Sequence, residues 1–262
     1  MEARRILEQA DEAGITLRLL GGVAIGVSCK ESTQPEFSRV YGDIDFIGLG
    51  DDGKKIRQLF ESLGYAANKT FNGLHGRERL VYYDLERSRQ VDIFLNIFRM
   101  CHTFDLRNRL RILPFTLPPA DLLLTKLQAI EINEKDFKDT ACLLKSKNVA
   151  SKDDADSINV EYISEICAKD WGIYKTLTTN LKELMGYVEN RLKIHQDELR
   201  SKTNEIIKNI EEKPKTTGWK MRERIGERKR WYDLPEEKRS QVPIGGQVGS
   251  AVSDAGHHPE IG

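Results

Sequence analysis

The segment Asp43-Ile44-Asp45-Phe46-Ile47-Gly48 decides how this chain is interpreted. Its alternation of polar and apolar residues is typical of a half-buried strand. Residues two apart on a strand point to the same face, so Asp43 and Asp45 present both carboxylates on one side. A second apolar run over residues 90–95 carries Asp92 in the same alternating way. If the two strands are neighbours, three carboxylates converge on one face of a sheet.

A glycine pair precedes these carboxylates. Residues 15–20 are predicted to form a short strand, and Gly21-Gly22 turns the chain into a helix over residues 23–28. Glycines allow backbone N–H groups to approach a triphosphate closely, since no Cβ intervenes. Taken alone, the glycines could form a simple tight turn, and the carboxylates could lie on a solvated strand face. Their combination, in this order, favours a metal-dependent phosphoryl-transfer site.

The length, net charge and cysteine content of the chain exclude several classes of protein. The chain has 262 residues, enough for one large or two modest domains, and its formal net charge is zero. No global field therefore indicates a nucleic-acid partner. The four cysteines form no C-x-x-C pair, and no run of eighteen apolar residues is present. We expect a soluble, cytoplasmic protein with free thiols and no membrane partner.

The order of the expected elements predicts an α+β fold, in which a small mixed twisted sheet is flanked by helices and followed by a helical subdomain. Residues 1–117 form the expected core, with helices over 2–13 and 54–63. The expected strands are 15–20, 43–48, 79–84, 90–98 and 111–113, and residues 68–76 are expected to be a loop. Residues 118–212 form the helical subdomain, with helices over 120–131, 136–147 and most of 160–212. Residues 213–262 form a basic segment and a flexible tail, whose last twenty-five residues are predicted to be disordered.

The three motifs together resemble those of the polymerase-beta-type nucleotidyltransferase superfamily. That superfamily shows hG[G/S], then Dh[D/E]h, then a third acidic residue on a later strand. Here the motifs are Leu20-Gly21-Gly22, Asp43-Ile44-Asp45-Phe46 and Val91-Asp92-Ile93. The resemblance spans roughly residues 15–146 and implies the nucleotidyltransferase fold, with residues 1–117 as the catalytic core.

Further residues are similar to the abortive-infection toxin branch of that superfamily and its uncharacterised relatives. Arg39 stands four residues before Asp43, as is frequent in the branch, although Tyr41 occupies a position where a small hydroxyl residue is usual. The segment 117–127 resembles a helix that carries a functional lysine, here Lys126. The segment Lys135-Asp136-Phe137-Lys138-Asp139 resembles the K-D-x-x-D helix that follows.

The resemblance implies a role for each matched residue. The implied metal ligands for Mg²⁺ or Mn²⁺ are Asp43, Asp45 and Asp92, and Asp92 would also be the general base. The implied nucleotide-binding set for an NTP is Gly21, Gly22, Arg39, Lys126 and Asp139, in which Asp139 would position Lys126. Gly22 replaces a serine seen in many members, so no hydroxyl is available there for the γ-phosphate.

Simpler interpretations stand beside these roles. Lys126 could be an exposed helix lysine, and Arg39 an ordinary loop charge. Asp136 and Asp139 could be surface carboxylates that pair with neighbouring lysines. The basic segment 213–232 contains Trp219 and Trp231, a composition that suits nucleic acid. The favoured alternative is that its tryptophans pack back onto the helical subdomain.

The sequence therefore leaves two classes of function open. The first is an enzyme that transfers a nucleoside monophosphate from an NTP to an acceptor hydroxyl and releases pyrophosphate. The resemblance implies tRNA or another RNA, an antibiotic, or a protein as acceptor. It also makes an antitoxin protein a candidate partner, should the chain be the toxin of a toxin–antitoxin pair. The second is a non-catalytic nucleotide- or nucleic-acid-binding protein on the same fold.

Overall fold

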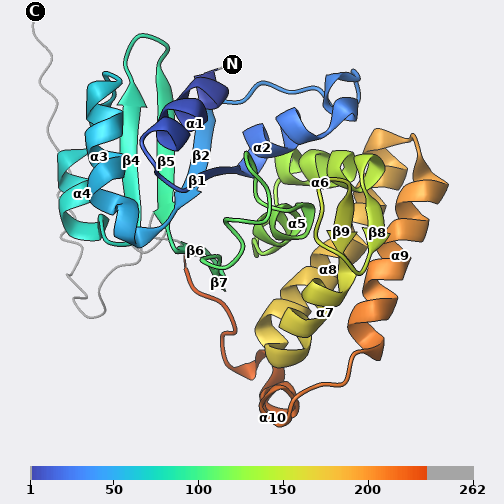
Figure 1. The fold of residues 1–262 in the computed structure, drawn as a ribbon. Helices are drawn as coiled ribbons and strands as arrows, with labels where there is room; N and C mark the ends of the chain where they lie inside the picture. The colour runs from blue at the N-terminus through green and yellow to red at the C-terminus, as the bar shows by residue number, and fades with distance from the viewer. Residues whose placement is uncertain (1, 235–262) are drawn as a thin grey trace, which may run out of the picture.

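The computed structural model of the chain describes residues 2–234, and the tail predicted to be disordered lies outside the described residues. A twisted sheet flanked by helices makes up one side of the molecule, and a group of helices lies beside it (Figure 1). The predicted α+β fold is thereby confirmed. Buried apolar residues form one continuous core that includes residues from both the sheet and the helical part.

The main sheet has five strands in the order β1-β2-β5-β4-β3. Their bounds are β1 Leu17–Leu20, β2 Asp43–Gly48, β3 Ala66–Ala67, β4 Arg79–Asp84 and β5 Arg89–Leu95. The central pair β2 and β5 is parallel, whereas every other neighbouring pair is antiparallel. The sheet is therefore mixed, as the sequence predicts.

One face of this sheet is covered by the first and third helices, α1 (Glu2–Glu12) and α3 (Gly53–Ser62). Phe60 of α3 packs against Phe46 and Tyr82, with ring centroids 6.1 and 5.1 Å apart. All three rings are fully buried. Because strand residues alternate, burying Phe46 on this face places the side chains of its two neighbours in the sequence on the other face.

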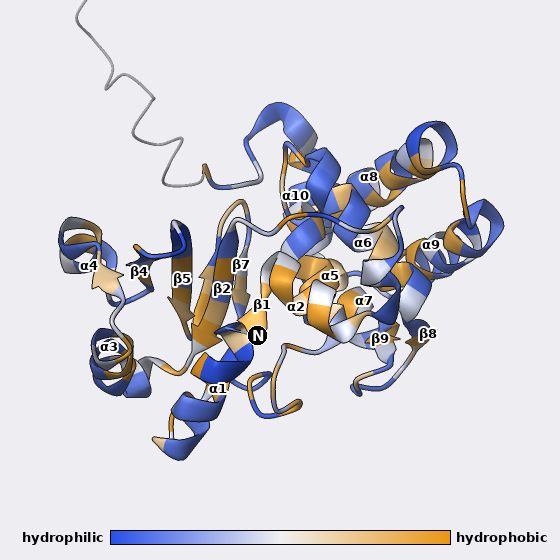
Figure 2. Cartoon of the chain, turned by 90° about the horizontal axis from the view of Figure 1, so that it is seen from above, coloured by the Kyte–Doolittle hydropathy of each residue, from blue (hydrophilic) through white to orange (hydrophobic). Residues whose placement is uncertain are grey.

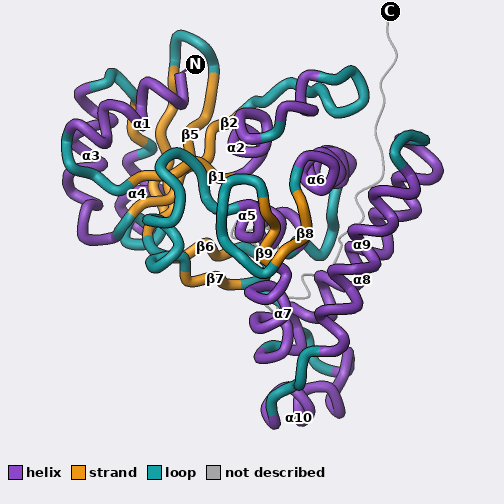
Figure 3. The backbone as a smooth tube through the Cα atoms, turned by 45° about the vertical axis from the view of Figure 1, so that its right-hand side comes forward, coloured by secondary structure: helices purple, strands orange, loops and turns teal. Residues whose placement is uncertain are grey.

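The helical part is built from α2, α5 and α6 next to the sheet and from α7 to α10 farther away (Figure 3). The bounds are α2 Gly21–Ser28, α5 Pro119–Leu127, α6 Glu134–Ser146, α7 Val160–Lys169, α8 Trp171–Tyr187, α9 Gln196–Glu212 and α10 Thr217–Ile225. Four of these helices begin at a side chain that accepts a backbone N–H bond, namely Asn133, Asn159, Asp170 and Thr216. Apolar residues concentrate on the central strands and on α2 and α5, where the two parts meet (Figure 2).

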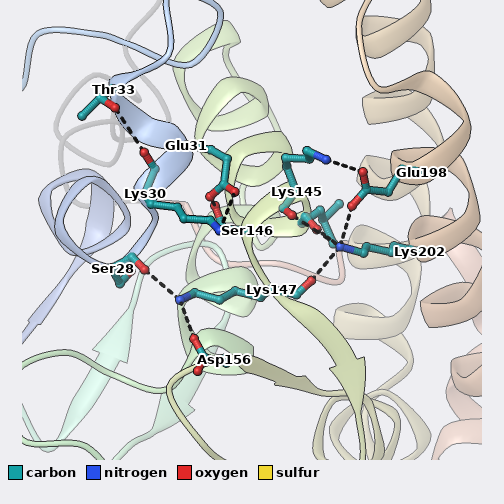
Figure 4. A network of polar contacts seen from close by, with 11 residues as sticks. Ser28, Lys30, Glu31, Thr33, Lys145, Ser146, Lys147, Asp156, Glu198 and Lys202 are labelled. Carbon is teal, nitrogen blue, oxygen red and sulfur yellow. Dashed lines mark hydrogen bonds and ion pairs between the residues drawn. The ribbon is translucent and has the colours of Figure 1, made fainter.

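Lysines link the C-terminal ends of α2 and α6 to the second turn of α9 (Figure 4). The ammonium of Lys202 on α9 donates to the carbonyls of Leu144 and Lys147, at 2.8 and 2.9 Å. Lys147 in turn donates to the carbonyl of Ser28, at the end of α2, at 2.7 Å. Cations at helix C-termini satisfy free carbonyls and complement the helix dipole. The end of α6 is thereby fixed to both its neighbours.

Several predicted elements differ from those observed. Residues 69–75 form a helix, α4 (Lys69–His75), rather than a loop. The side chain of Asn68 caps it, and Asn72 exchanges hydrogen bonds with the backbone of Val81. Residues 111–113 form no strand. The predicted strand 90–98 is divided at Asn96, whose positive φ of 64° separates β5 from β6 (Ile97–Arg99). Four short strands were not predicted: β3, β7 (Thr103–Asp105), β8 (Asn148–Ala150) and β9 (Ser157–Asn159).

The first part of the basic segment packs back onto the helical part. Trp219 of α10 is buried and meets Tyr174 edge to face at 5.1 Å. Trp231 donates to the hydroxyl of Thr176 at 3.1 Å. The two tryptophans therefore pack onto the helical part, as the favoured alternative for this segment predicts. None of the helices within residues 2–234 combines the length and the apolar character that crossing a bilayer requires.

Candidate active site

The parallel pairing of β2 and β5 places the three predicted carboxylates side by side. Asp45 lies directly opposite Asp92 in the strand register, and Asp43 lies opposite Gln90. These side chains are on the sheet face that α1 and α3 leave free. Asp43 is exposed, Asp45 is partly buried, and Asp92 is only 3% exposed. The carboxylates thus extend from the strand start at the surface into the protein.

Asp92 is already engaged by two neighbours. One of its oxygens accepts a bond from Nε of Arg79 at 2.8 Å, and the other accepts from Nε2 of Gln90 at 2.6 Å. Among residues 2–234, no three His, Cys, Asp or Glu side chains are arranged as a ready metal site. The sequence reasoning missed Arg79 and Gln90. The signal for Gln90 was its place two residues before Asp92, on the same strand face.

Asp45 lies against the glycine turn. A methyl group added to Gly21 would come within 2.1 Å of Oδ2 of Asp45, and Gly21 has a φ of +70°. Burial raises the pKa of Asp45 to about 7, and the neighbouring carboxylates of Asp43 and Asp92 add to that effect. The helix α2 begins at Gly21, whereas the sequence predicts that it begins at Val23, after a glycine turn. A glycine is therefore needed at position 21 both for the backbone conformation and for the space that Asp45 fills.

Arg39 and Lys126 share one carboxylate, that of Asp139. Nε and Nη2 of Arg39 each donate to Asp139 at 2.7 Å, which is a bidentate pair. Nζ of Lys126 lies 2.9 Å from Asp139 and 2.8 Å from Asp136. Burial alone would lower the pKa of Lys126, but the carboxylates of Asp139 and Asp136 raise it. Arg39 is therefore not an unpaired loop charge, and Lys126 is not an exposed lysine.

The glycine at position 22 leaves room for this pair. A methyl group there would lie 1.8 Å from Nη2 of Arg39 and 3.2 Å from Oδ2 of Asp139. The guanidinium of Arg39 also lies over the ring of Tyr41, with its carbon 4.3 Å from the ring centroid. The space beside the start of α2 is thus filled by a cation that comes from the loop preceding β2.

A cavity of about 460 Å³ joins these groups. Five of the predicted site residues line it, namely Gly22, Arg39, Asp43, Asp45 and Lys126. The other three, Gly21, Asp92 and Asp139, lie behind lining residues and contact them. Gly21 packs against Asp45, and Asp92 accepts a hydrogen bond from Gln90. Asp139 forms ion pairs with Arg39 and Lys126. We term this space the carboxylate cavity.

The groups around the carboxylate cavity suit a divalent cation in their chemistry. Asp43, Asp45 and Asp92 provide only oxygen donors, which Mg²⁺ and Mn²⁺ prefer. Burial and the charges of Asp43 and Asp92 disfavour the ionised form of Asp45 and raise its pKa, a cost that a bound cation would offset. Asp92 would need to give up a bond to Arg79 or Gln90 before it could bind a metal fully.

The close contact between Gly21 and Asp45 predicts that a larger residue at position 21 destabilises the fold. Replacing Gly21 by Ala forces a left-handed φ on a residue with a Cβ and pushes that Cβ against Asp45. We expect the change to lower the free energy of unfolding by about 1–3 kcal/mol. Urea denaturation measures it. The matched control is Gly73→Ala in α4, where an added Cβ meets nothing within 4 Å. Equal effects at the two positions would contradict the prediction.

Comparison with known proteins adds one structural likeness. No protein-family model matches the chain, and no curated protein matches it. Among solved structures, it is similar to the solution structure of the antibiotic-resistance factor ANT(2'')-Ia. That likeness has a TM-score of 0.37 and 14% sequence identity, and it covers 55% of this chain and 80% of the other. Any functional assignment for this α+β protein must therefore come from its own residues.

Proposed function

We propose that the chain is a metal-dependent nucleotidyltransferase, which transfers a nucleoside monophosphate from an NTP to an acceptor hydroxyl and releases pyrophosphate. One observation carries the proposal. The carboxylates of Asp43 and Asp45 line the same cavity as the cations of Arg39 and Lys126, beside the uncapped start of α2. A triphosphate with a bound cation needs both kinds of charge within one space.

Each side of the carboxylate cavity has a distinct task in this proposal. The first N–H groups of α2 have no side-chain cap and can bind phosphate oxygens. Arg39 and Lys126 neutralise further phosphate charge, and Asp139 holds both cations in position. A divalent metal held by Asp43, Asp45 and Asp92 would neutralise the reacting phosphate and activate the acceptor oxygen. Asp92 is the proposed acceptor of the hydroxyl proton.

The test is a transfer assay with each labelled NTP, Mg²⁺ and mixed acceptors. The acceptors are total tRNA, a protein extract and an antibiotic panel, so the labelled fraction identifies the acceptor class. We expect label on one of them and loss of at least a hundredfold in rate in the double variant Asp43→Asn/Asp45→Asn. The matched control is Asp51→Asn/Asp52→Asn, which changes the same number of charges just after β2.

The contacts of Asp92 favour a second candidate, a non-catalytic nucleotide-binding protein. Both of its oxygens are engaged by Arg79 and Gln90, and in this candidate Asp92 keeps both bonds and accepts no proton. This candidate predicts that wild type binds Mg-NTP but labels no acceptor. Mg-NTP binding that is equally strong in the Asp43→Asn/Asp45→Asn variant would contradict the two-metal interpretation itself.

A further inference from the structure

A larger cavity adjoins the carboxylate cavity on the side of Asp43. Its volume is about 830 Å³, and it lies between α1, α2, the loop before β2 and residues 113–116. Arg39 and Asp43 line both cavities. We term this second space the α1–α2 groove. A molecule in the groove would therefore meet the carboxylate cavity at Asp43, the first residue of β2.

The walls of the α1–α2 groove expose apolar side chains. Val27 is 64% exposed, Val40 is 88% exposed and Phe115 is 43% exposed, and all three line the groove. Below them lie the buried side chains of Leu7 and Leu19. Exposed apolar side chains that gather around one cavity mark a binding site, because leaving them in water is unfavourable.

Of the charged side chains that line the groove, which also include Asp43 and Arg89, three have partners. Glu2 accepts bonds from Arg5 and from the hydroxyl of Tyr65. Arg4 lies over the ring of Phe115, with its carbon 5.5 Å from the centroid. Arg39 is held by Asp139. Two of its three lining cations are thus engaged and its walls expose apolar side chains, so the groove suits an apolar body better than the phosphate backbone of a nucleic acid, which is bound by lines of available cations.

We propose that the α1–α2 groove binds the acceptor and that the acceptor is a small molecule with a hydroxyl group on an apolar or aromatic body. This inference rests on the proposed nucleotidyltransferase function. The volume of the groove is within the range of small-molecule sites, which are mostly apolar with a few placed polar groups. The apolar body packs against Val27 and Phe115, and the hydroxyl lies at the Asp43 end.

The reaction at that end is a displacement at the α-phosphorus of the NTP. The hydroxyl oxygen forms a bond to that phosphorus, and the bond from the phosphorus to the bridging oxygen of pyrophosphate breaks. The electron pair of the broken bond leaves on pyrophosphate, and the hydroxyl proton passes to a carboxylate, the task proposed for Asp92. No oxidant or further reactant is needed.

The experiment uses the full chain and 2-naphthol, a hydroxyl on an apolar aromatic body, with xylitol as a polar hydroxyl probe. Equilibrium dialysis measures the binding of each probe without nucleotide, and a second measurement follows Mg-NTP binding. The variants are Val27→Asp and Phe115→Ser, which put polar groups on the groove wall. The control is Leu74→Asp, because Leu74 is 76% exposed on α4 and does not line the groove.

We expect saturable binding of 2-naphthol to wild type and to Leu74→Asp, at least tenfold weaker binding to both groove variants, and no saturable binding of xylitol. With labelled NTP and Mg²⁺ present, label should appear on 2-naphthol. Unsaturable binding, an equal loss in the control, or label on RNA that the groove variants leave unchanged would overturn the inference. Failure of the proposed function would appear separately, as absent Mg-NTP binding in wild type or as Mg-NTP binding without label on any acceptor, while the dialysis with 2-naphthol still tests the groove.

Discussion

Replacing Asp45 by Asn is expected to stabilise the metal-free protein by about 2 kcal/mol at pH 8, while it removes the proposed nucleotide transfer. The reason is the position of Asp45 between Asp43 and Asp92, where burial and two like charges raise its pKa from 3.8 to about 7. At pH 8 the wild-type carboxylate is ionised in surroundings that disfavour its charge. An amide has nearly the same shape and carries no charge, so it avoids that cost.

The pH dependence of this effect has a defined sign. Between about pH 4 and pH 7 the folded protein binds a proton at Asp45 that the unfolded chain has released. The wild type therefore loses stability as the pH rises through that window, and the Asn variant does not. The difference between them should be small at pH 4 and full at pH 8.

Urea denaturation in EDTA at a series of pH values measures the difference, with Asp51→Asn as the control at an exposed aspartate. Adding Mg²⁺ at pH 8 should raise the unfolding temperature of wild type and leave that of Asp45→Asn unchanged. An Asp45→Asn variant that is less stable than wild type at pH 8 would show that the three carboxylates do not repel one another.

Replacing Asp139 by Asn is expected to lower the free energy of unfolding by about 3 kcal/mol. Asp139 is 2% exposed and is the shared partner of Arg39 and Lys126. The amide keeps the shape but removes the negative charge, so two cations remain close together in a largely buried place. Such uncompensated charge is far more costly than the loss of a surface ion pair.

The control for this prediction is Asp136→Asn, which removes the other carboxylate bonded to Lys126. Asp136 is more exposed and does not bond to Arg39, so its replacement should cost about 1 kcal/mol or less. Urea denaturation of both variants at pH 7 gives the comparison. Equal losses would mean that Asp139 does not organise the cation pair.

The strand at 43–48 is predictable from the sequence because the alternation of polar and apolar residues that indicates it lies within the segment itself. The sequence also predicts which faces Asp43, Asp45 and Asp92 occupy, since side-chain direction follows directly from strand periodicity. The helix at 69–75 was not predictable in this way. It is stabilised by a cap from Asn68 and by bonds between Asn72 and Val81, and only the folded chain brings the last pair together.

Pairings between distant residues were likewise beyond the sequence. The resemblance named Arg39 and Asp139 as site residues, but these are 100 positions apart and their bidentate pair depends on how α6 packs beside α2. The ion pair of Arg79 with Asp92 depends on the register of β4 against β5. Local patterns therefore fix the direction of a side chain, whereas partners across elements follow from packing.

The crowding at position 22 constrains which sequences this architecture permits. A side chain on residue 22 and a guanidinium from residue 39 would occupy the same volume. A side chain at position 22 would therefore displace the guanidinium of Arg39 from its present position beside the start of α2. In the proposed nucleotidyltransferase, loss of Arg39 would remove a charge that no hydroxyl on residue 22 replaces.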